Sequence, residues 1–371
     1  MKIVIDARTM GSKPSGIGIY TFNYLKELVK TEQKLILLTD VETSEEMEYM
    51  RRKGIEIISY GKIVYRSAQV FKYFAFVQKE LCKIQPDIFW EPNVLIPSML
   101  SGFKGKVMIT IHDMFPVTHV QYFGWKYGVY FRLLLRWTMQ KADIVLYDSA
   151  ETKEEAERYL SRLRTKNNYI LYVIAPVLEA LNASNQCNIG SEVKDQEYFL
   201  YVGNMEKRKG VDLLLDAYIK YRKAGGTKAL ILAGKSREND IDKKISDLTN
   251  NYDNVFYYGY VSDEEKQWLY RNCSCFIFPS MAEGFGICVL EAMNYYKPII
   301  ASDLSIFKEI VGESINYFPL AGGRTAQIDS LSKKMLGDYQ TPNQRDYDKV
   351  MSRYLPERLG RQVNGIINEV R

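Results

Sequence analysis

Two glutamates frame the densest set of groups in the chain that could bind a ligand. Glu283 and Glu291 are separated by seven residues, and Gly284-Phe285-Gly286 follows the first acid, between an apolar run and a helical pattern. Carboxylates accept hydrogen bonds from pairs of sugar or ribose hydroxyls, and the N–H groups at a helix N-terminus bind phosphate. The spacing supports a ligand site and a solvated turn followed by a surface helix residue about equally.

Cations gather in a second segment, directly after the apolar run 198–202. Gly203 and Asn204 come first, and Arg208 and Lys209 follow with another lysine before them. An arginine beside a lysine offers a planar fork and a point charge, which together can neutralise a diphosphate leaving group. Standing alone, such a segment favours a solvated basic turn.

Two motifs in the first half place small and polar residues next to expected strands. Gly16 and Gly18 lie between the opening strand and a helix, although a lone Gly-x-Gly is a weak signal. His112 and Asp113 follow another expected strand, at the edge where parallel sheets bind ligands. An imidazole there can bond sugar hydroxyls or stabilise developing charge, and a structural histidine fits the sequence equally well.

The elements that position these residues alternate along the chain. Short apolar runs alternate with segments of helical period, which predicts parallel strands joined by right-handed helical crossovers. Strands are expected at 2–6, 34–38, 55–58, 87–90, 106–111, 143–147 and 170–174, then at 198–202, 229–233, 254–258, 274–279, 298–301 and 315–318. Helices are expected at 18–30, 42–52, 66–83, 123–141 and 150–160, then at 210–223, 240–249, 262–271, 287–295 and 305–311.

A polar stretch with many turn-forming residues interrupts this alternation and predicts a linker over 182–196. The chain then divides into a first domain over 1–181 and a second over 197–354, with a helix over 355–371 that packs back on the first domain. The expected fold class is α/β, with two Rossmann-like, doubly wound parallel-sheet domains facing a central cleft.

Composition excludes several classes of protein. With 371 residues, 46% of them hydrophobic, the chain suits two packed domains. No apolar run reaches the ~18 residues of a membrane-spanning helix, and the first residues form no signal peptide, so a cytoplasmic location is expected. The net charge of +5 is compatible with an anionic partner without requiring nucleic acid. Two histidines and one C-x-C pair give no reason to expect a metal site.

Two expected helices, 66–83 and 123–141, combine large aromatic side chains with lysines and arginines, and the second contains no acidic residue. Helices of this kind can lie on an anionic membrane surface. A core crossover helix with a narrow solvated stripe has the same pattern, and for 123–141 this interpretation is favoured.

Taken together, these segments resemble the retaining nucleotide-sugar glycosyltransferases of glycosyltransferase family 4, which have the two-domain GT-B fold. The resemblance rests on Glu283-Gly-Phe-Gly-Ile-Cys-Val-Leu-Glu291, on Pro279-Ser280 before it, on Ser15-Gly-Ile-Gly-Ile-Tyr-Thr and on Ile111-His-Asp-Met-Phe-Pro. Both halves of the chain are covered. The resemblance implies that the first domain is on the acceptor side and that the second binds the sugar-nucleotide donor.

Carried over by position, the resemblance implies roles in the second domain. Glu291 would bind the ribose, and Glu283, with the amides near Phe285-Gly286, would bind the sugar. Arg208 and Lys209 would hold the diphosphate.

In the first domain, His112 would touch the donor sugar, and Asp113 beside it is expected on the acceptor side. Gly16 and Gly18 would let the phosphates or the acceptor approach the backbone.

Gly203, Asn204 and Gly284 complete the expected donor-binding set. The chain departs from the family pattern in two places. Many relatives have an arginine where this chain has Asn204, which leaves Arg208 to supply the charge. Tyr296 occupies a position that is commonly glycine.

The resemblance implies transfer with retained anomeric configuration through an oxocarbenium-like state. The expected catalytic residues are His112, Glu283, Lys209 and Arg208, and each leaving-group contact is worth ~2 to 4 kcal/mol. Glu283 as a nucleophile is the alternative route. Neither cofactor nor metal is expected, because the candidate D-x-D motif, Asp240-Ile-Asp242, opens an expected helix instead of ending a strand.

The expected function is transfer of a sugar from a nucleoside-diphosphate sugar, GDP-mannose or similar, to a glycan acceptor. That acceptor is expected on a polyprenyl-diphosphate carrier in surface polysaccharide biosynthesis, with peripheral contact to the inner face of an anionic membrane. No nucleic-acid partner is expected. The alternatives are a soluble small-molecule transferase, a nucleotide-sugar epimerase of the same fold, or a non-catalytic sugar-nucleotide sensor.

Overall fold

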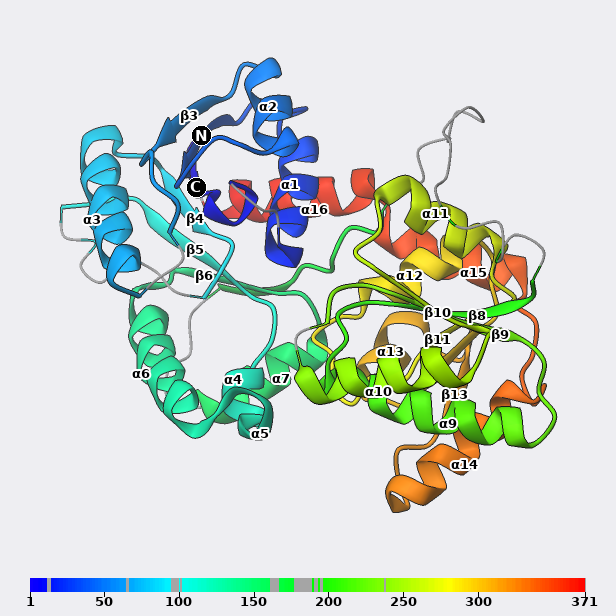
Figure 1. The fold of residues 1–371 in the computed structure, drawn as a ribbon. Helices are drawn as coiled ribbons and strands as arrows, with labels where there is room; N and C mark the ends of the chain where they lie inside the picture. The colour runs from blue at the N-terminus through cyan, green and yellow to red at the C-terminus, as the bar shows by residue number, and fades with distance from the viewer. Residues whose placement is uncertain are drawn as a thin grey trace. The chain divides into compact units, whose positions relative to one another are not determined.

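The computed structural model describes residues 1–11, 15–64, 67–94, 100, 102–160, 167–176, 189, 193, 196–236 and 238–370. The chain divides into unit 1, Met1–Ile174 with Tyr354–Arg371, and unit 2, Ala175–Arg353. Each unit contains one parallel sheet with helices around it, so the predicted fold class of two Rossmann-like, doubly wound units is confirmed (Figure 1).

The sheet of unit 1 has the strand order β3-β2-β1-β4-β5-β6-β7, and every pair is parallel. The strands are β1 (Lys2–Asp6), β2 (Lys34–Thr39), β3 (Glu56–Ser59), β4 (Ile88–Glu91), β5 (Lys106–Ile111), β6 (Ile144–Tyr147) and β7 (Asn167–Ile170). Successive strands run outward in opposite directions from β1 and β4, so the topological switch point lies between these two.

The helical segments of unit 1 lie between these strands along the chain, except for α16 near the C-terminus. They are η1 (Arg8–Met10), α1 (Gly16–Leu28), α2 (Glu45–Arg52), α3 (Ser67–Ile84), α4 (Phe115–Thr118), α5 (Val120–Phe123), α6 (Trp125–Lys141), α7 (Ala150–Tyr159) and α16 (Pro356–Glu369). Central strands are buried on both faces, which explains why they read as continuous apolar runs rather than alternating ones. One core cluster joins strands to α3 and α6 through residues such as Val4, Val77, Phe89 and Leu135.

The last strand of this sheet differs from the prediction. The apolar run 170–174 was expected as a strand, but the strand is Asn167–Ile170, and the chain then continues without regular structure. Leu171 still donates its N–H to the Tyr147 carbonyl at 2.7 Å. The run is apolar because Leu171, Val173 and Ile174 are buried, so burial rather than strand pairing explains its composition.

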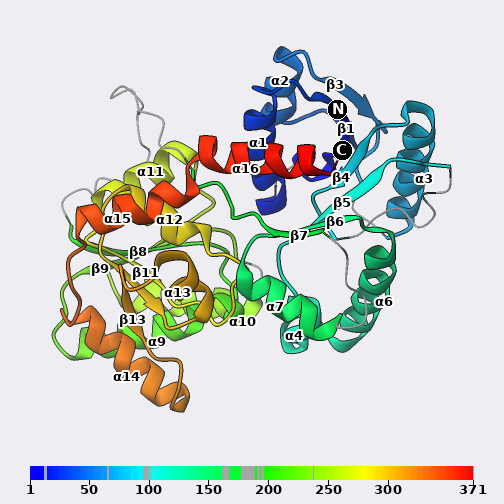
Figure 2. The same ribbon diagram turned by 180° about the vertical axis from the view of Figure 1, so that it is seen from behind.

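The C-terminal helix α16 belongs to unit 1, where it lies beside α1 in both views (Figures 1 and 2). A Cβ added at Gly360 would lie 2.6 Å from the Cβ of Glu27, so the absence of a side chain lets the two helices approach. Unit 1 ends its first segment at Ile174, earlier than the expected domain end at 181. The expected linker over 182–196 lies almost entirely outside the described residues.

The sheet of unit 2 is also parallel, with the order β10-β9-β8-β11-β12-β13. The strands are β8 (Tyr198–Val202), β9 (Ala229–Ala233), β10 (Val255–Gly259), β11 (Cys275–Phe278), β12 (Ile299–Ser302) and β13 (Asn316–Phe318). The helical segments are η2 (Lys207–Lys209), α9 (Val211–Lys223), α10 (Asn239–Asn251), α11 (Asp263–Asn272), α12 (Ile287–Asn294), α13 (Ser305–Val311), α14 (Gly323–Met335) and α15 (Gln344–Met351). A short η3 (Ser352–Tyr354) leads into α16.

Serine side chains begin several of these helices. Each accepts the backbone N–H of the third residue after it, which satisfies one of the donors that a helix N-terminus leaves unpaired. The capping serines are Ser15 of α1, Ser44 of α2, Ser149 of α7 and Ser262 of α11. Across the described residues, no helix is both long and apolar enough to cross a membrane.

Candidate functional site

Lysine and glutamate meet at the carboxyl edge of the unit 2 sheet. Lys209 lies in η2, after β8, and Glu283 lies in the loop between β11 and α12. The Lys209 Nζ donates to both Glu283 carboxylate oxygens, at 2.5 and 2.8 Å, and the side chains are only 17% and 5% exposed. Two residues 74 positions apart thus form a partly buried ion pair, where charges interact more strongly than in bulk water.

Arg208 lies in the same turn and contacts the same loop. Its Nη1 donates to the Ala282 carbonyl at 2.7 Å, and its Nη2 is 3.5 Å from a carboxylate oxygen of Glu206. The backbone carbonyl of Arg208 accepts the N–H of Met281 at 2.8 Å. The loop after β8 and the loop after β11 are therefore fastened together, so the predicted residues Arg208, Lys209 and Glu283 form one cluster.

Close backbone packing explains two glycines at this edge that the sequence did not single out. Gly210 has φ +69°, and a Cβ there would lie 1.8 Å from the Pro279 carbonyl oxygen. Gly234, after β9, has φ +140°, and a Cβ there would lie 1.9 Å from the Gly203 carbonyl oxygen. Only glycine tolerates both the conformation and the contact. The sequence contained a signal for both, because Gly234 directly follows the predicted strand 229–233 and Gly210 begins the predicted helix 210–223.

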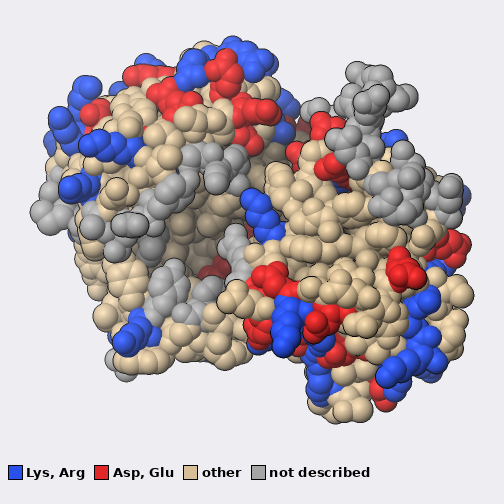
Figure 3. Space-filling view, viewed as in Figure 1, with Lys and Arg blue, Asp and Glu red and all other residues tan. Residues whose placement is uncertain are grey.

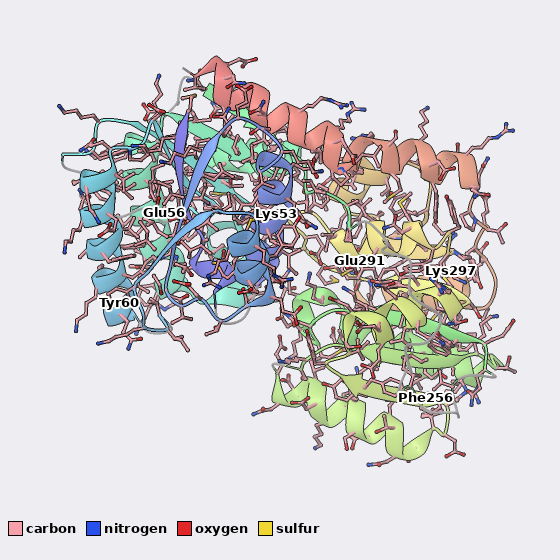
Figure 4. All side chains as sticks on the ribbon, turned by 90° about the horizontal axis from the view of Figure 1, so that it is seen from above. Lys53, Glu56, Tyr60, Phe256, Glu291 and Lys297 are labelled. Atoms are coloured by element: carbon pink, nitrogen blue, oxygen red, sulfur yellow. The ribbon has the colours of Figure 1, made fainter. Side chains whose placement is uncertain are left out.

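Glu291 is held by two residues of α11. Its Oε1 accepts from Lys266 Nζ at 3.1 Å, and its Oε2 accepts from Tyr270 Oη at 2.9 Å. Glu291 lies in α12 and is labelled, with Lys297, in Figure 4. Burial opposes the charge of Lys266, but the Glu291 and Asp263 carboxylates outweigh it and raise its pKa. Burial and the same Glu291 charge raise the pKa of Tyr270, which stays a proton donor.

These partners were missed by the sequence analysis. Lys266 and Tyr270 lie within an ordinary amphipathic helix, and neither residue type nor spacing separates them from surface residues. Only the packing of α11 against α12 shows that they fix both oxygens of Glu291.

The predicted glycine loop leads directly into α12. Gly286 adopts φ +88°, and a Cβ there would lie 2.5 Å from the Phe307 ring, while Phe285 is buried. Burial and the Glu291 charge raise the pKa of the Cys288 thiol, one turn before Glu291, to about 12. Gly284 is half-buried between Glu283 and Phe285. The loop therefore turns the chain from β11 into the start of α12.

The two departures from the family pattern have clear positions. Asn204 follows Gly203 after β8, and its carbonyl accepts the hydroxyl of the buried Tyr201 at 2.9 Å. Tyr296 adopts φ +52°, a left-handed conformation that costs most L-residues about 1 kcal/mol. Its hydroxyl donates to Asp348 at 2.7 Å. A glycine would meet the backbone requirement at Tyr296 without strain.

In unit 1, His112 lies at the end of β5 with both ring nitrogens engaged. Nδ1 is 3.3 Å from Asp148 Oδ2, and Nε2 is 2.8 Å from the Pro92 carbonyl oxygen. Asp148 follows β6 and is buried. Since a carbonyl only accepts, Nε2 carries a proton, and the ring is oriented from both sides.

Burial disfavours the charged forms of both His112 and Asp148, and each residue shifts the pKa of the other. Burial lowers the pKa of His112, but the hydrogen bond and charge of Asp148 outweigh it, so the net shift is upward. Burial raises the pKa of Asp148 to about 6, although His112 acts in the opposite direction. The sequence analysis missed Asp148, because it lies 36 residues from His112 and shares no motif with it.

The remaining predicted residues of unit 1 have local partners. Asp113 Oδ1 accepts the N–H of Phe115 at 3.0 Å, at the start of α4. Gly18 donates its N–H to Ser15 Oγ at 3.2 Å, and a Cβ there would lie 2.1 Å from the Thr9 carbonyl oxygen. A Cβ at Gly16 would meet nothing within 4 Å. Gly18 is thus required by close packing, while the space beside Gly16 is open.

No three histidine, cysteine, aspartate or glutamate side chains converge as a metal site within the part of the chain that the structure describes. The candidate D-x-D motif, Asp240-Ile241-Asp242, lies in the first turn of α10, where Asp240 pairs with Lys207.

Comparisons with known proteins agree with this architecture. Residues 14–166 match the model of Glycosyltransferase Family 4, and residues 185–348 match that of Glycosyl transferases group 1. Among curated relatives, the O-antigen chain mannosyltransferase B of Escherichia coli is 25% identical over 345 residues, 85% of each chain. The O-antigen chain mannosyltransferase RfbU of Salmonella typhimurium is 27% identical over 329 residues, 85% of this chain and 86% of that one.

Solved structures share the fold. The Anabaena protein HepE in complex with UDP and glucose matches over the whole of both chains, with a TM-score of 0.75 and 16% identity. WaaG, a glycosyltransferase involved in lipopolysaccharide biosynthesis, matches with a TM-score of 0.67 and 15% identity over 98% of this chain and 100% of that one.

The two Rossmann-like units form the GT-B fold, and both family models that match the chain describe glycosyltransferases. Because its first part matches the Glycosyltransferase Family 4 model and its second part matches the Glycosyl transferases group 1 model, the chain is a family 4-like glycosyltransferase.

Proposed function

We propose that this glycosyltransferase moves mannose, or a closely related sugar, from a nucleoside diphosphate to a glycan acceptor with retained anomeric configuration and without a metal. The cluster of Lys209, Arg208 and Glu283 at the carboxyl edge of unit 2 carries the proposal. It joins two cations to a carboxylate beside the start of α12, which suits a sugar diphosphate. The mannosyltransferase relatives favour mannose, and the O-antigen in their names favours a surface polysaccharide as the product. We propose a polyprenyl-diphosphate carrier for the acceptor in addition.

In the proposed reaction, the bond between the anomeric carbon and the diphosphate oxygen breaks as the acceptor hydroxyl attacks from the same face. The hydroxyl proton passes to the leaving diphosphate oxygen. Lys209 and Arg208 act on the negative charge that grows on this oxygen, and preorganised donors at such positions are worth ~2 to 4 kcal/mol each. Glu291, fixed by Lys266 and Tyr270, would bind the ribose hydroxyls, and His112 would contact the sugar.

A panel of nucleotide sugars tests the proposal. The purified chain is incubated with GDP-mannose and with UDP- and dTDP-linked sugars, with and without EDTA, and released nucleoside diphosphate is measured beside the anomeric configuration of the product. We expect release from one donor, strongest for GDP-mannose, unchanged by EDTA, with retention. Loss of activity in EDTA would overturn metal independence, and binding without release in the presence of polyprenyl-diphosphate-linked glycans would favour a sugar-nucleotide sensor.

We further propose that unit 1 contacts an anionic membrane through α6, which would bring the enzyme to a lipid-linked acceptor. Trp125, Val129 and Leu133 recur at every fourth residue and are 67%, 48% and 61% exposed. Residues four apart share one helix face. As a core crossover helix, α6 packs one face into the core through Phe131 and Leu135, and its exposed side carries this line of apolar residues.

Cations border this apolar line. Lys126, Arg132 and Arg136 are exposed on α6, and no acid occurs between residues 114 and 142. Figure 3 shows mostly tan side chains with blue patches over this helix. Large apolar side chains that insert among headgroups, flanked by cations that attract anionic lipids, are the features of an interfacial helix.

Co-sedimentation with vesicles tests the membrane contact. We expect binding to vesicles that contain anionic phospholipid, weaker binding at high salt, and loss of binding in Trp125→Ser/Leu133→Ser. Leu336→Ser, at a comparably exposed leucine of unit 2, serves as the matched control and should bind normally. Equal binding of both variants, or no binding of the wild-type chain, would remove α6 from the proposal.

A further inference from the structure

A buried group of charges at the switch point of unit 1 is not used by the function proposed above. Asp6 ends β1, Glu91 ends the adjacent strand β4, and Arg8 lies in the turn between β1 and α1. Both acids are 1% exposed. Ligands of doubly wound sheets bind outside the carboxyl ends of the strands at the switch point.

The two carboxyl groups flank the arginine. Arg8 Nε is 3.4 Å from Asp6 Oδ2, and Arg8 Nη2 is 3.5 Å from Glu91 Oε1. Asp6 Oδ1 accepts from the hydroxyl of Tyr73 at 2.8 Å and from the Arg8 N–H at 3.1 Å. The guanidinium also lies over the rings of Tyr73 and Phe74, at 5.4 and 4.9 Å from their centroids. Packing and charge therefore fix the plane of the guanidinium.

Two carboxylate oxygens of this group lack a hydrogen bond, although one of them, Asp6 Oδ2, lies within ion-pair distance of Arg8. Asp6 Oδ2 and Glu91 Oε2 are buried without a hydrogen bond, which is uncommon in folded proteins and costs free energy. Burial and the neighbouring Asp6 charge raise the pKa of Glu91, whereas Arg8 acts in the opposite direction. When Glu91 carries a proton, the group consists of one anion and one cation and does not repel a further anion.

Arg8 is the member of the group that can reach a ligand. Its side chain is 13% exposed, and its Nη1 has no partner among the described residues. A guanidinium whose other nitrogens face carboxylates presents its remaining N–H donors in a fixed direction, and planar donors of this kind bind phosphate oxygens.

We propose that Arg8 binds a phosphate oxygen of a substrate diphosphate and that Asp6 and Glu91 are positioning residues that hold its guanidinium. The proposal depends on the proposed function only in requiring a diphosphate substrate. That diphosphate belongs either to the sugar nucleotide or to the polyprenyl carrier of the acceptor, since both present the same anionic oxygens.

Binding without turnover distinguishes these sources. Titration calorimetry measures the affinity of the full chain for GDP, for UDP and for a short prenyl diphosphate. The variants are Arg8→Lys, which keeps the charge but loses the fork, and Arg8→Gln/Glu91→Gln, which removes the cation together with one acid. Arg51→Lys is the matched control, an exposed arginine of α2 that pairs with Glu42 and Glu48. Circular dichroism and thermal melting verify the fold of each variant.

We expect both Arg8 variants to weaken binding of one diphosphate class roughly tenfold or more, and Arg51→Lys to change none. Weaker prenyl diphosphate binding alone assigns Arg8 to the acceptor, and weaker GDP or UDP binding alone assigns it to the donor. If folded Arg8→Lys and the double variant both bind every ligand within twofold of wild type, the group is structural and the inference is wrong. A wild-type chain that binds no diphosphate contradicts the proposed function as well.

Discussion

The acids at the carboxyl edges of the two sheets are stabilised in different ways. In unit 2, Glu283 and Glu291 each pair with a lysine of a neighbouring element, at 2.5 and 3.1 Å. In unit 1, Asp148 and Glu91 are buried with one oxygen lacking a hydrogen bond, and their pKa values are raised.

This difference separates two kinds of site. A carboxylate that is paired with a cation offers a fixed acceptor to hydroxyl groups. Burial raises the pKa of Asp148 to about 6 and also raises that of Glu91, and perturbed groups of this kind cluster at functional sites. Unit 2 thus fixes its acids through ion pairs, whereas burial raises the pKa values of Asp148 and Glu91 in unit 1.

Removing the lysine of the Lys209–Glu283 pair should have the largest effect. We expect Lys209→Ala to lower kcat roughly 100-fold, because the leaving diphosphate loses a preorganised cation. Lys207→Ala provides the control, since Lys207 pairs with the exposed Asp240 instead. Steady-state kinetics with the donor identified by the panel measures both, and thermal melting verifies folding. Full activity of Lys209→Ala would contradict the catalytic assignment.

Loosening Glu291 should have a smaller effect, on donor binding. Tyr270→Phe removes one hydrogen bond to a charged group, worth about 1.5 to 3 kcal/mol, so we expect the donor KM to rise roughly tenfold with kcat within about threefold. Tyr218→Phe removes a comparable hydroxyl that donates to the Lys228 and Asn254 carbonyls. If both variants keep the wild-type KM, Tyr270 does not position Glu291 for the donor.

The titratable character of unit 1 can be tested at Asp148. In Asp148→Asn, His112 loses the main cause of its raised pKa while burial still lowers it. We therefore expect the alkaline limb of the pH profile of kcat/KM to move to lower pH. Asp87→Asn, at an exposed acid that bonds the Lys2 N–H, should leave the profile unchanged. An unchanged limb in Asp148→Asn would show that His112 does not titrate in catalysis.

The same pair affects stability with a defined sign. Asp148 has a folded pKa of about 6, above its ordinary value of 3.8, so it stabilises the fold below that ordinary value and loses this contribution as pH rises through about 6. His112 has the same sign, with its contribution present below about 6.5 and lost as pH rises through the raised value. We expect the melting temperature of wild type to fall as pH rises from 4 to 7, and that of Asp148→Asn, which lacks the aspartate and in which burial lowers the His112 pKa, not to fall.

The smallest effect is expected at Tyr296, which follows the helix of Glu291. Tyr296→Asn relieves the left-handed strain but loses the exposed bond to Asp348, so we expect a gain of up to about 1 kcal/mol and unchanged kinetics. Tyr296→Phe, which loses only the bond, is the control. A lower melting temperature for Tyr296→Asn than for Tyr296→Phe would show that the strain is not relieved.

Much of the unit 2 site could be predicted, because its residues lie in contiguous segments. Glu283, Gly286 and Glu291 fall within nine residues, and Arg208 and Lys209 fall in one turn after a strand. The partners of these residues could not be predicted, since Lys266 and Tyr270 are typical of any amphipathic helix. In unit 1, Asp6, Glu91 and Asp148 each end or follow a different strand, and none belongs to a recognisable motif.

The sequence by itself determined the alternation of strands and helices, because apolar runs and helical periods are local properties. It also determined the family, because the glycine and glutamate spacing is local. Only the tertiary structure decided that Glu283 pairs with Lys209, that Asp148 orients His112, and that Arg8 lies between Asp6 and Glu91. These contacts join residues up to 83 positions apart, and the order of strands in a sheet, which brings them together, is set by packing rather than by local pattern.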